Sequence, residues 1–244
     1  MPRPQARPPT AAAKRRPALL PHSGTLAASL SCAILLVAAA AQAARNPHLE
    51  RLAPNHSDQA LAAAAILATS DLGHGWVSVP DPSKSRNPPS CPGVNVDLSR
   101  FTITGQAESL FHRTHDWILS RVQLYPTHQQ ALADFTTTTT AARRCNTYSI
   151  THQLRADSPA TTVKLLSHQS RPLTHLGQQA LADRILIAAT NNHQHSLLHI
   201  DAIDFTRGRY TATIVYVHNG HPPAYDTTLA RTIATRLHPQ PPPA

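Results

Sequence analysis

Three strand-like segments between residues 182 and 218 constrain the fold more than any other part of the sequence. They are ADRILIAAT, SLLHIDAIDF and RYTATIVYVH, separated by Asn191-Asn192 and by Arg207-Gly208. Short runs rich in apolar and β-branched residues, in part alternating with polar ones, are typical of strands, and Asn and Gly tolerate the positive φ angles of tight turns. The sequence therefore predicts three consecutive antiparallel strands.

A further hairpin is predicted within residues 107–125, AESLFHRTHDWILSRVQLY, with its turn near Arg113-Thr114. Its second strand places Ile118, Val122 and Leu124 on one face. This face is expected to be buried.

Two helices are predicted near the ends of the body. The first begins at a cap on Ser57 or Asp58 and runs to about Thr69. The last begins at a cap on Asp226 or Thr227 and carries one apolar stripe, formed by Leu229, Ile233 and Leu237.

A third helix contains five consecutive threonines, residues 136–140. Thr127 and Gln130 have the spacing of a capping box, so the helix is expected to start there. Its buried stripe is expected to consist of Leu132, Phe135, Thr139 and Ala142. Because β-branched threonines are mediocre helix formers, the helix should depend on packing against the sheet.

The order strand, strand, helix recurs at residues 107–144 and 196–238. We expect one α+β domain over residues 57–238, with an antiparallel sheet of five to seven strands, helices packed on one face, and two similar β-β-α halves. Residues 45–56 are expected to form a linker and residues 239–244 a Pro-rich tail. Residues 155–182 show no clear pattern.

The N-terminal 44 residues indicate export. Gly24 to Ala44 is an uncharged stretch of 21 residues that follows a basic segment, and Ala41-Gln42-Ala43 is a small-x-small cleavage site. This pattern predicts a signal peptide cut after Ala43, although the stretch is also long enough for an uncleaved signal anchor. The body is therefore expected outside the cytoplasm, either secreted or anchored to the membrane.

Removal of the leader leaves two cysteines, Cys91 and Cys145. An even pair in an oxidising compartment predicts a disulfide, with two buried free thiols as the alternative. Cys91 belongs to residues 80–93, a segment rich in Pro and Ser that is expected to be a loop.

The net charge of +9 gives little support for a nucleic-acid partner. The first 44 residues supply five of these charges, and the remainder has 17 Lys and Arg against 13 Asp and Glu. A nucleic-acid-binding protein usually gathers its cations on one face.

The sequence contains none of the common catalytic motifs, neither a G-x-S-x-G elbow, a phosphate-binding loop, a G-x-G-x-x-G turn nor H-E-x-x-H. A non-enzymatic protein without a cofactor is therefore expected, and an unrecognised hydrolase stays open. Imidazoles near one end of the sheet offer a metal-binding alternative, although their spacing fits no fixed signature. These imidazoles belong to His193, His195, His199, His218 and His221.

Four large aromatic residues are candidates for a ligand pocket: Trp76, Trp117, Tyr210 and Tyr216. Large apolar pockets with a few polar groups are the usual binding sites. The alternative is that the four side chains belong to the core.

Several segments, in this order, resemble the extracytoplasmic sensor domain of mycobacterial PknH-type receptor kinases and related actinobacterial exported proteins. They are ILATSDLGHGW, the SCPG loop, the strand-helix unit ending in ARRC, and DFTRGRYTATIVYV before a terminal helix ending in TRL. The resemblance spans about residues 60–238. It implies an α+β domain with a cleft for a small ligand and no catalysis of its own.

Two departures from that family are expected, since these 244 residues show no kinase-domain pattern and offer one possible disulfide where the sensor domains have two. A second small α+β fold of exported actinobacterial proteins, of the PsbP type, is equally compatible with the pattern. From these features we expect an exported, non-enzymatic domain of the cell envelope that binds a small molecule or an envelope component. Membrane contact is expected only through the N-terminal segment, if it is not cleaved.

Overall fold

The computed structural model describes residues 50–79, 96–144, 149–152, 161–191, 194–218 and 227–237. The predicted leader, the loop over residues 80–93 and Cys145 lie outside the described residues, and so does the predicted disulfide. Among the residues described, no helix combines the length and the apolar character needed to cross a bilayer.

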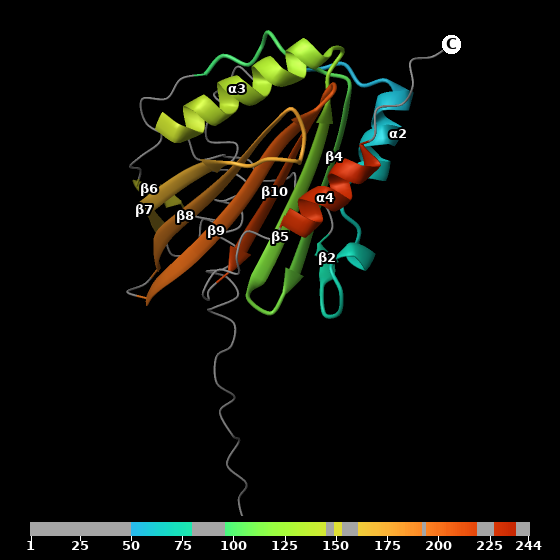
Figure 1. Ribbon diagram of the computed structural model, residues 1–244. Coiled ribbons are helices and arrows are strands. Elements are labelled where there is room, and N and C mark those ends of the chain that lie inside the picture. Colours follow the sequence, from blue (N-terminus) through green and yellow to red (C-terminus); the bar gives the residue numbers. More distant parts are fainter. Residues whose placement is uncertain are drawn as a thin grey trace, which may run out of the picture.

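An antiparallel sheet in the order β2-β4-β5-β10-β9-β8-β7-β6 forms the centre of the fold (Figure 1). Its strands are β2 (Val77–Val79), β4 (Gly105–Arg113), β5 (Asp116–Leu124), β6 (Ser149–His152), β7 (Thr161–Pro172), β8 (Gln179–Asn191), β9 (Gln194–Arg207) and β10 (Tyr210–His218). The helices are α2 (His56–Ala65), the 3-10 turn η1 (Thr69–Asp71), α3 (His128–Arg144) and α4 (Thr227–Arg236). The predicted α+β class with one antiparallel sheet is confirmed, and two short edge strands, β2 and β6, bring the number of strands to eight.

All three hairpins expected from the turn residues are present, namely β4–β5, β8–β9 and β9–β10, and left-handed residues close two of them. The β4–β5 turn contains Thr114 at φ 52°, and the β9–β10 turn contains Gly208 at φ 57°. These are the left-handed conformations that close a tight hairpin turn. The two hairpins lie side by side because β5 pairs with β10.

The segment expected to be a linker contains β1 (Arg51–Leu52), which pairs in parallel with β3 (Thr102–Ile103). The amides of Arg51 and Ala53 donate to the carbonyls of Phe101 and Ile103, both at 2.9 Å. Ordered structure therefore begins before residue 57.

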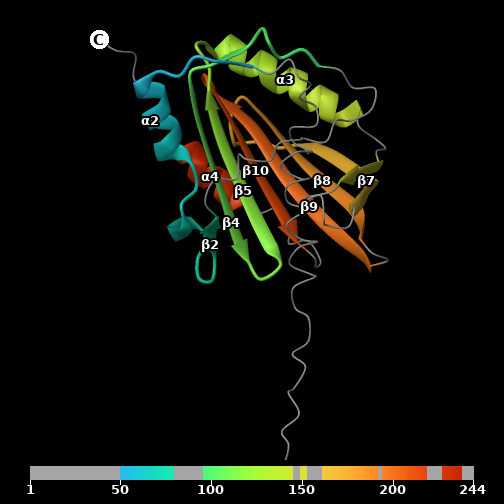
Figure 2. The same cartoon turned by 180° about the vertical axis from the view of Figure 1, so that it is seen from behind.

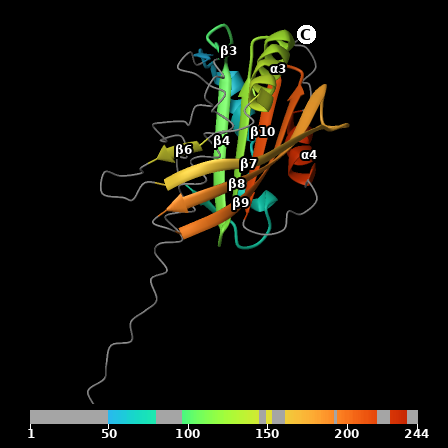
Figure 3. The same ribbon diagram turned by 90° about the vertical axis from the view of Figure 1, so that its left-hand side faces the viewer.

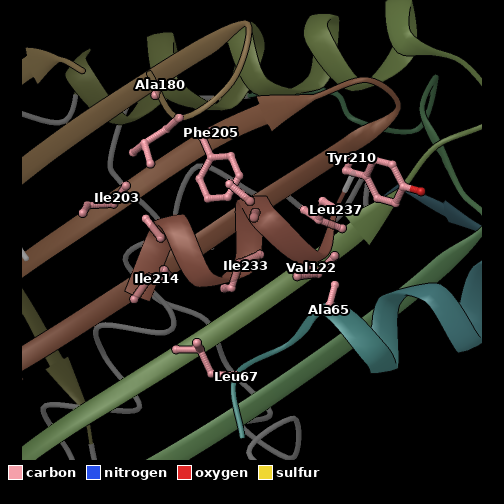
Figure 4. Packing of buried hydrophobic residues seen from close by; sticks show 14 of the residues in the cluster. Ala65, Leu67, Val122, Ala180, Ile203, Phe205, Tyr210, Ile214, Ile233 and Leu237 are labelled. Atoms are coloured by element: carbon pink, nitrogen blue, oxygen red, sulfur yellow. The ribbon is translucent and has the colours of Figure 1, made fainter. Parts of the chain in front are cut away.

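One face of the sheet, which we call the α4 face, carries α2 and α4 (Figure 4). The even-numbered residues of β5 and β10 point to it. The predicted strand face is confirmed, since Ile118, Val122 and Leu124 are all buried in this core. Ile233 of α4 and Leu237, which follows the helix, are buried in the same core, where each apolar side chain contributes about 2 kcal/mol.

The first helix differs from its prediction at both ends. Its cap is Asn55, whose side chain accepts from the amide of Asp58 at 2.9 Å, so the predicted caps are wrong. The helix ends at Ala65 because the sheet binds the backbone of Leu67. The Leu67 carbonyl accepts from Ser109 Oγ at 3.1 Å, and its amide donates to Ser120 Oγ at 3.5 Å.

Two features hold α2 close to β4. Gly105 leaves the space that the approach requires, because a Cβ there would overlap the carbonyl of Asp58. The side-chain amide of Gln59 also hydrogen-bonds the Gln106 carbonyl at 2.6 Å and the Gln106 amide at 3.2 Å. Strand β2 pairs only with residues 110–112 of β4, so Gln59 satisfies part of an edge where β2 does not reach.

An ion pair joins the first helix to the β9–β10 turn. The two guanidinium nitrogens of Arg209 donate to the two carboxylate oxygens of Asp58, and one nitrogen also donates to the Tyr125 carbonyl at 3.2 Å. Asp58 is 2% exposed. The Arg209 guanidinium therefore connects residue 58 of α2 with residue 125, which follows β5.

The threonine run is helical, and its hydroxyl groups bond back to the helix. Thr136, Thr137, Thr138 and Thr139 each donate to the carbonyl four residues earlier, at 2.7–2.9 Å. Thr127 caps the helix, with its hydroxyl accepting from the Gln130 amide at 3.2 Å. The Gln130 side chain does not complete the capping box; it accepts from the Thr102 amide instead.

The buried stripe of α3 is shifted by about one residue from the expected stripe, and only Phe135 is common to both. Ala131, Asp134, Phe135 and Ala141 are the buried residues. A buried hydrogen bond accounts for the shift, since Tyr125 donates its hydroxyl to Asp134 at 2.7 Å. This bond turns the helix so that Asp134 faces inward.

Helix α3 crosses the upper ends of the strands, whereas α4 runs alongside them (Figures 2 and 3). Two of its side chains contact residues of the sheet side: Asp134 accepts from Tyr125, and Arg143 donates to Ser170 on β7. These residues project to the side of the sheet opposite α4. The expectation of helices on one face therefore holds for α2 and α4, and the two β-β-α units share an order of elements while their helices take different faces.

Strand β7 lies in the segment that gave no sequence pattern. It pairs with β8 along its whole length, but the register shifts between Leu165 and Ser167. The shift leaves Leu166 46% exposed while Val163 and Leu165 are buried. A bulge of this kind breaks the alternation by which a strand is recognised.

Candidate functional site

The structure separates the four aromatic residues proposed for a pocket. Trp76 and Tyr216 contact each other on the α4 face, with ring centroids 6.4 Å apart in an edge-to-face arrangement. Tyr210 is on the same strand as Tyr216 but six residues away, a distance of about 20 Å along a strand, and packs beside Leu237 in the core (Figure 4). Trp117 points to the opposite face, where it contacts His112 at 5.2 Å.

Two histidines extend the Trp76–Tyr216 pair into a continuous group. The imidazole of His218 stacks on Tyr216 at 4.8 Å and on His199 at 5.4 Å, with interplanar angles of 25° and 15°. We call Trp76, Tyr216, His218 and His199 the ring cluster. It lies at the end of β9 and β10 away from α3, where Trp76 directly precedes β2.

The hairpin register explains why the two imidazoles meet. The β9–β10 turn pairs Arg207 with Tyr210, and counting outward pairs His199 with His218. Directly opposed side chains on one face of an antiparallel pair are close enough to interact. Tyr216 precedes His218 by two residues on β10, so its ring lies on the same face of the sheet.

Four charged side chains surround the ring cluster and bind it to the neighbouring strands. Tyr216 donates its hydroxyl to Asp116 Oδ2 at 3.1 Å, and Arg113 contacts the same oxygen at 3.4 Å. On the other side, Asp201 Oδ2 lies 3.4 Å from His218 Nε2, and its Oδ1 accepts from Arg184 Nε at 2.8 Å. Each side of the ring cluster therefore carries one carboxylate paired with one guanidinium group.

The protonation of this site follows from burial and from these contacts. For Asp201, burial alone would raise the pKa, but hydrogen bonds from His218 and Arg184 and their charges hold the pKa below its usual value. For Tyr216, burial and the neighbouring charge of Asp116 raise the pKa to about 12. At neutral pH the site therefore presents ionised Asp201 and a protonated phenol.

The histidines proposed as metal ligands are only partly brought together. His199 and His218 stack, whereas His195 hydrogen-bonds Thr190 Oγ1 through Nδ1 at 3.0 Å. His193 and His221 lie outside the described residues. Within the part of the chain that the structure describes, no group of three or more His, Cys, Asp or Glu could hold a metal ion.

A second polar group bears on the hydrolase alternative. Ser170 Oγ donates to Asp183 Oδ1, and His168 Nε2 lies 2.9 Å from the same oxygen. The serine and the imidazole thus both bind the carboxylate, in place of the serine-to-imidazole bond by which histidine activates a serine nucleophile. Arg143 Nε also donates to Ser170 Oγ, at 3.3 Å.

The charged residues of the site were not identified from the sequence. Asp116 and Arg113 flank the turn of a predicted hairpin, so counting from that turn would have paired them. Arg184 and Asp201 are also directly opposed, on β8 and β9. The approach of Trp76 to Tyr216 depends on the pairing of β5 with β10, which no local pattern encodes.

Comparison with known proteins gives a structural likeness and no sequence match. No protein-family model matches the sequence, and no curated protein sequence matches it. The crystal structure of the extracellular domain of PknH from Mycobacterium tuberculosis is similar to this chain with a TM-score of 0.49 and 10% sequence identity, over 75% of this chain and 97% of that one. The domain that the sequence motifs resemble is thus also among the structural neighbours of this chain.

Proposed function

We propose that this chain is an exported, non-enzymatic domain whose ring cluster binds a small molecule or a component of the cell envelope. The proposal is supported mainly by one observation, the convergence of four rings and four charged groups at one end of the α4 face. Export is supported by the N-terminal sequence pattern.

The arrangement suits recognition better than a purely structural role. His218 and Trp76 are 3% and 8% exposed and fix the positions of the groups around them. The side chains of Arg184 and Asp116 keep 30% and 27% of their surface exposed. Polar groups held from behind by packed rings lose little conformational freedom when a ligand binds.

Binding at the ring cluster can be tested with isotope-labelled protein, residues 45–244, produced in an oxidising compartment. Soluble sugar and peptide fragments of a bacterial envelope are titrated while the amide resonances are followed by NMR. A ligand should shift resonances near His199 and Tyr216 saturably. Arg184→Ala should weaken that binding at least about fivefold, the factor that about 1 kcal/mol produces.

Arg231→Ala is the matched control, because Arg231 is an exposed arginine on α4. It should bind the same fragment as the parent protein does. Saturable binding that Arg184→Ala leaves unchanged, or shifts confined to other parts of the sheet, would contradict the assignment of the site.

A further inference from the structure

The guanidinium of Arg113 lies on the ring of Trp76. Its central carbon is 4.7 Å from the ring centroid, within the range of a cation–π contact. The residue before the tryptophan lies against the same arginine side chain. Gly75, at φ 87°, has no side chain, and a Cβ there would lie 3.3 Å from Cδ of Arg113. The Arg113 side chain therefore packs against both Gly75 and the ring of Trp76.

A carboxylate and a phenol complete the surroundings of this guanidinium. Asp116 Oδ2 lies 3.4 Å from a terminal nitrogen of Arg113 and accepts the Tyr216 hydroxyl at 3.1 Å. Tyr216 also contacts Trp76 edge to face, which fixes the tilt of both rings. An aromatic face, a second ring and a carboxylate form a recurrent kind of site for organic cations.

Arg113 occupies this position from the surface. It is the last residue of β4, next to the turn, and its side chain is 44% exposed. Exposed contacts of this kind are individually weak, so the side chain can leave without disturbing the sheet. The carboxylate and the tryptophan face would then be open to another cation.

We propose that Trp76, Tyr216 and Asp116 form a binding site for a guanidinium group of a partner peptide, and that Arg113 occupies this site as an intramolecular competitor. This inference rests on the proposed function of the ring cluster and names the chemistry of its ligand. A guanidinium is favoured over an ammonium because the site already holds one: a planar, delocalised cation can stack on the ring while it hydrogen-bonds the carboxylate.

Tryptophan fluorescence tests the proposal directly. The sequence contains two tryptophans, so Trp117→Phe leaves Trp76 as the only reporter. N-acetyl-L-arginine amide is titrated into this protein with and without Arg113→Ala, and N-acetyl-L-citrulline amide serves as the uncharged probe of similar shape. Removal of the competitor should tighten binding of the arginine probe about tenfold, equivalent to about 1.4 kcal/mol.

Three further results are expected. The citrulline probe should leave the fluorescence unchanged, Asp116→Asn should weaken binding of the arginine probe, and Arg231→Ala should not tighten it. Arg113→Gln, which keeps most of the side-chain length, replaces Arg113→Ala if the melting temperature of the alanine variant falls. The proposal is wrong if neither Arg113 variant binds the arginine probe more tightly than the parent, or if both probes bind equally.

The outcome also separates this inference from the proposed function. An envelope fragment without a cationic group that shifts the ring-cluster resonances would preserve the function and overturn the guanidinium assignment. Failure of every fragment and of both probes would overturn both.

Discussion

The ion pair between Asp58 and Arg209 gives a stability prediction that the structure makes quantitative. Arg209→Met removes the charge and keeps an apolar stem of similar length. Loss of one partner from a buried ion pair costs about 3–5 kcal/mol, because the remaining charge is left uncompensated. Two features reduce this cost: the Arg209 side chain is 35% exposed, and Asn55 Nδ2 still donates to Asp58 at 3.0 Å. We therefore expect the free energy of unfolding to fall by about 2–3 kcal/mol.

Urea unfolding followed by far-UV circular dichroism at pH 7 measures this change. A double-mutant cycle with Asp58→Asn isolates the interaction, and we expect a coupling energy of about 2 kcal/mol between the two positions. A loss below about 0.5 kcal/mol for Arg209→Met, the size of an ordinary surface substitution, would refute the reasoning. So would a coupling energy near zero.

The Asp58–Arg209 ion pair also predicts how the free energy of unfolding changes at acidic pH. Burial alone would raise the pKa of Asp58, but hydrogen bonds from Arg209, Thr104 and Asn55 and the charge of Arg209 hold it below its usual value of 3.8. A carboxylate with a lowered folded-state pKa stabilises the fold above its unfolded-state pKa, and this stability is lost as the pH falls through the folded-state value. The unfolding free energy of the parent protein should therefore fall more steeply below about pH 4 than that of Asp58→Asn.

Packing, ionisation and covalent structure each give one more prediction. Gly105→Ala should lower the free energy of unfolding by about 2–3 kcal/mol, because the new Cβ meets the backbone of α2 and not a flexible side chain; a urea midpoint equal to that of the parent would contradict this. Tyr216 should titrate near pH 12, so stability should decline between about pH 10 and 12 in the parent but less in Tyr216→Phe; ultraviolet titration in which Tyr216→Phe removes a tyrosine of ordinary pKa would argue against it. Reduction of the predicted Cys91–Cys145 bridge should cost about 4 kcal/mol and loosen α3 first; hydrogen exchange that shows α3 unaffected would count against this prediction.

Local sequence patterns predicted the elements whose signals are local. The β9–β10 hairpin follows from alternation and from a turn that needs a left-handed residue at Gly208. The threonine run was correctly predicted as a helix because Thr127 provides a cap. The end of the first helix could not be predicted, because Ser109 and Ser120, both more than 40 residues away in sequence, bind the backbone of Leu67.

The site was predicted less completely than the fold. Trp76 and Tyr216 were identified as aromatic residues of interest, but so were Tyr210 and Trp117, which the structure places elsewhere. Residue type alone does not separate them, since the distinction depends on strand position and on which side of the sheet each residue faces. The opposition of His199 and His218 follows from counting outward from the β9–β10 turn, once that turn is located.

The two hydrogen bonds made by the Gln59 side chain affect the tendency of this protein to aggregate. An open strand edge can accept a strand from a neighbouring chain and so begin a growing aggregate. At Gln106 both the amide and the carbonyl are already engaged by one glutamine of the same chain. The Gln59 side chain thus blocks this part of the β4 edge. Gln59→Ala would be expected to make a concentrated solution aggregate sooner, as measured by turbidity.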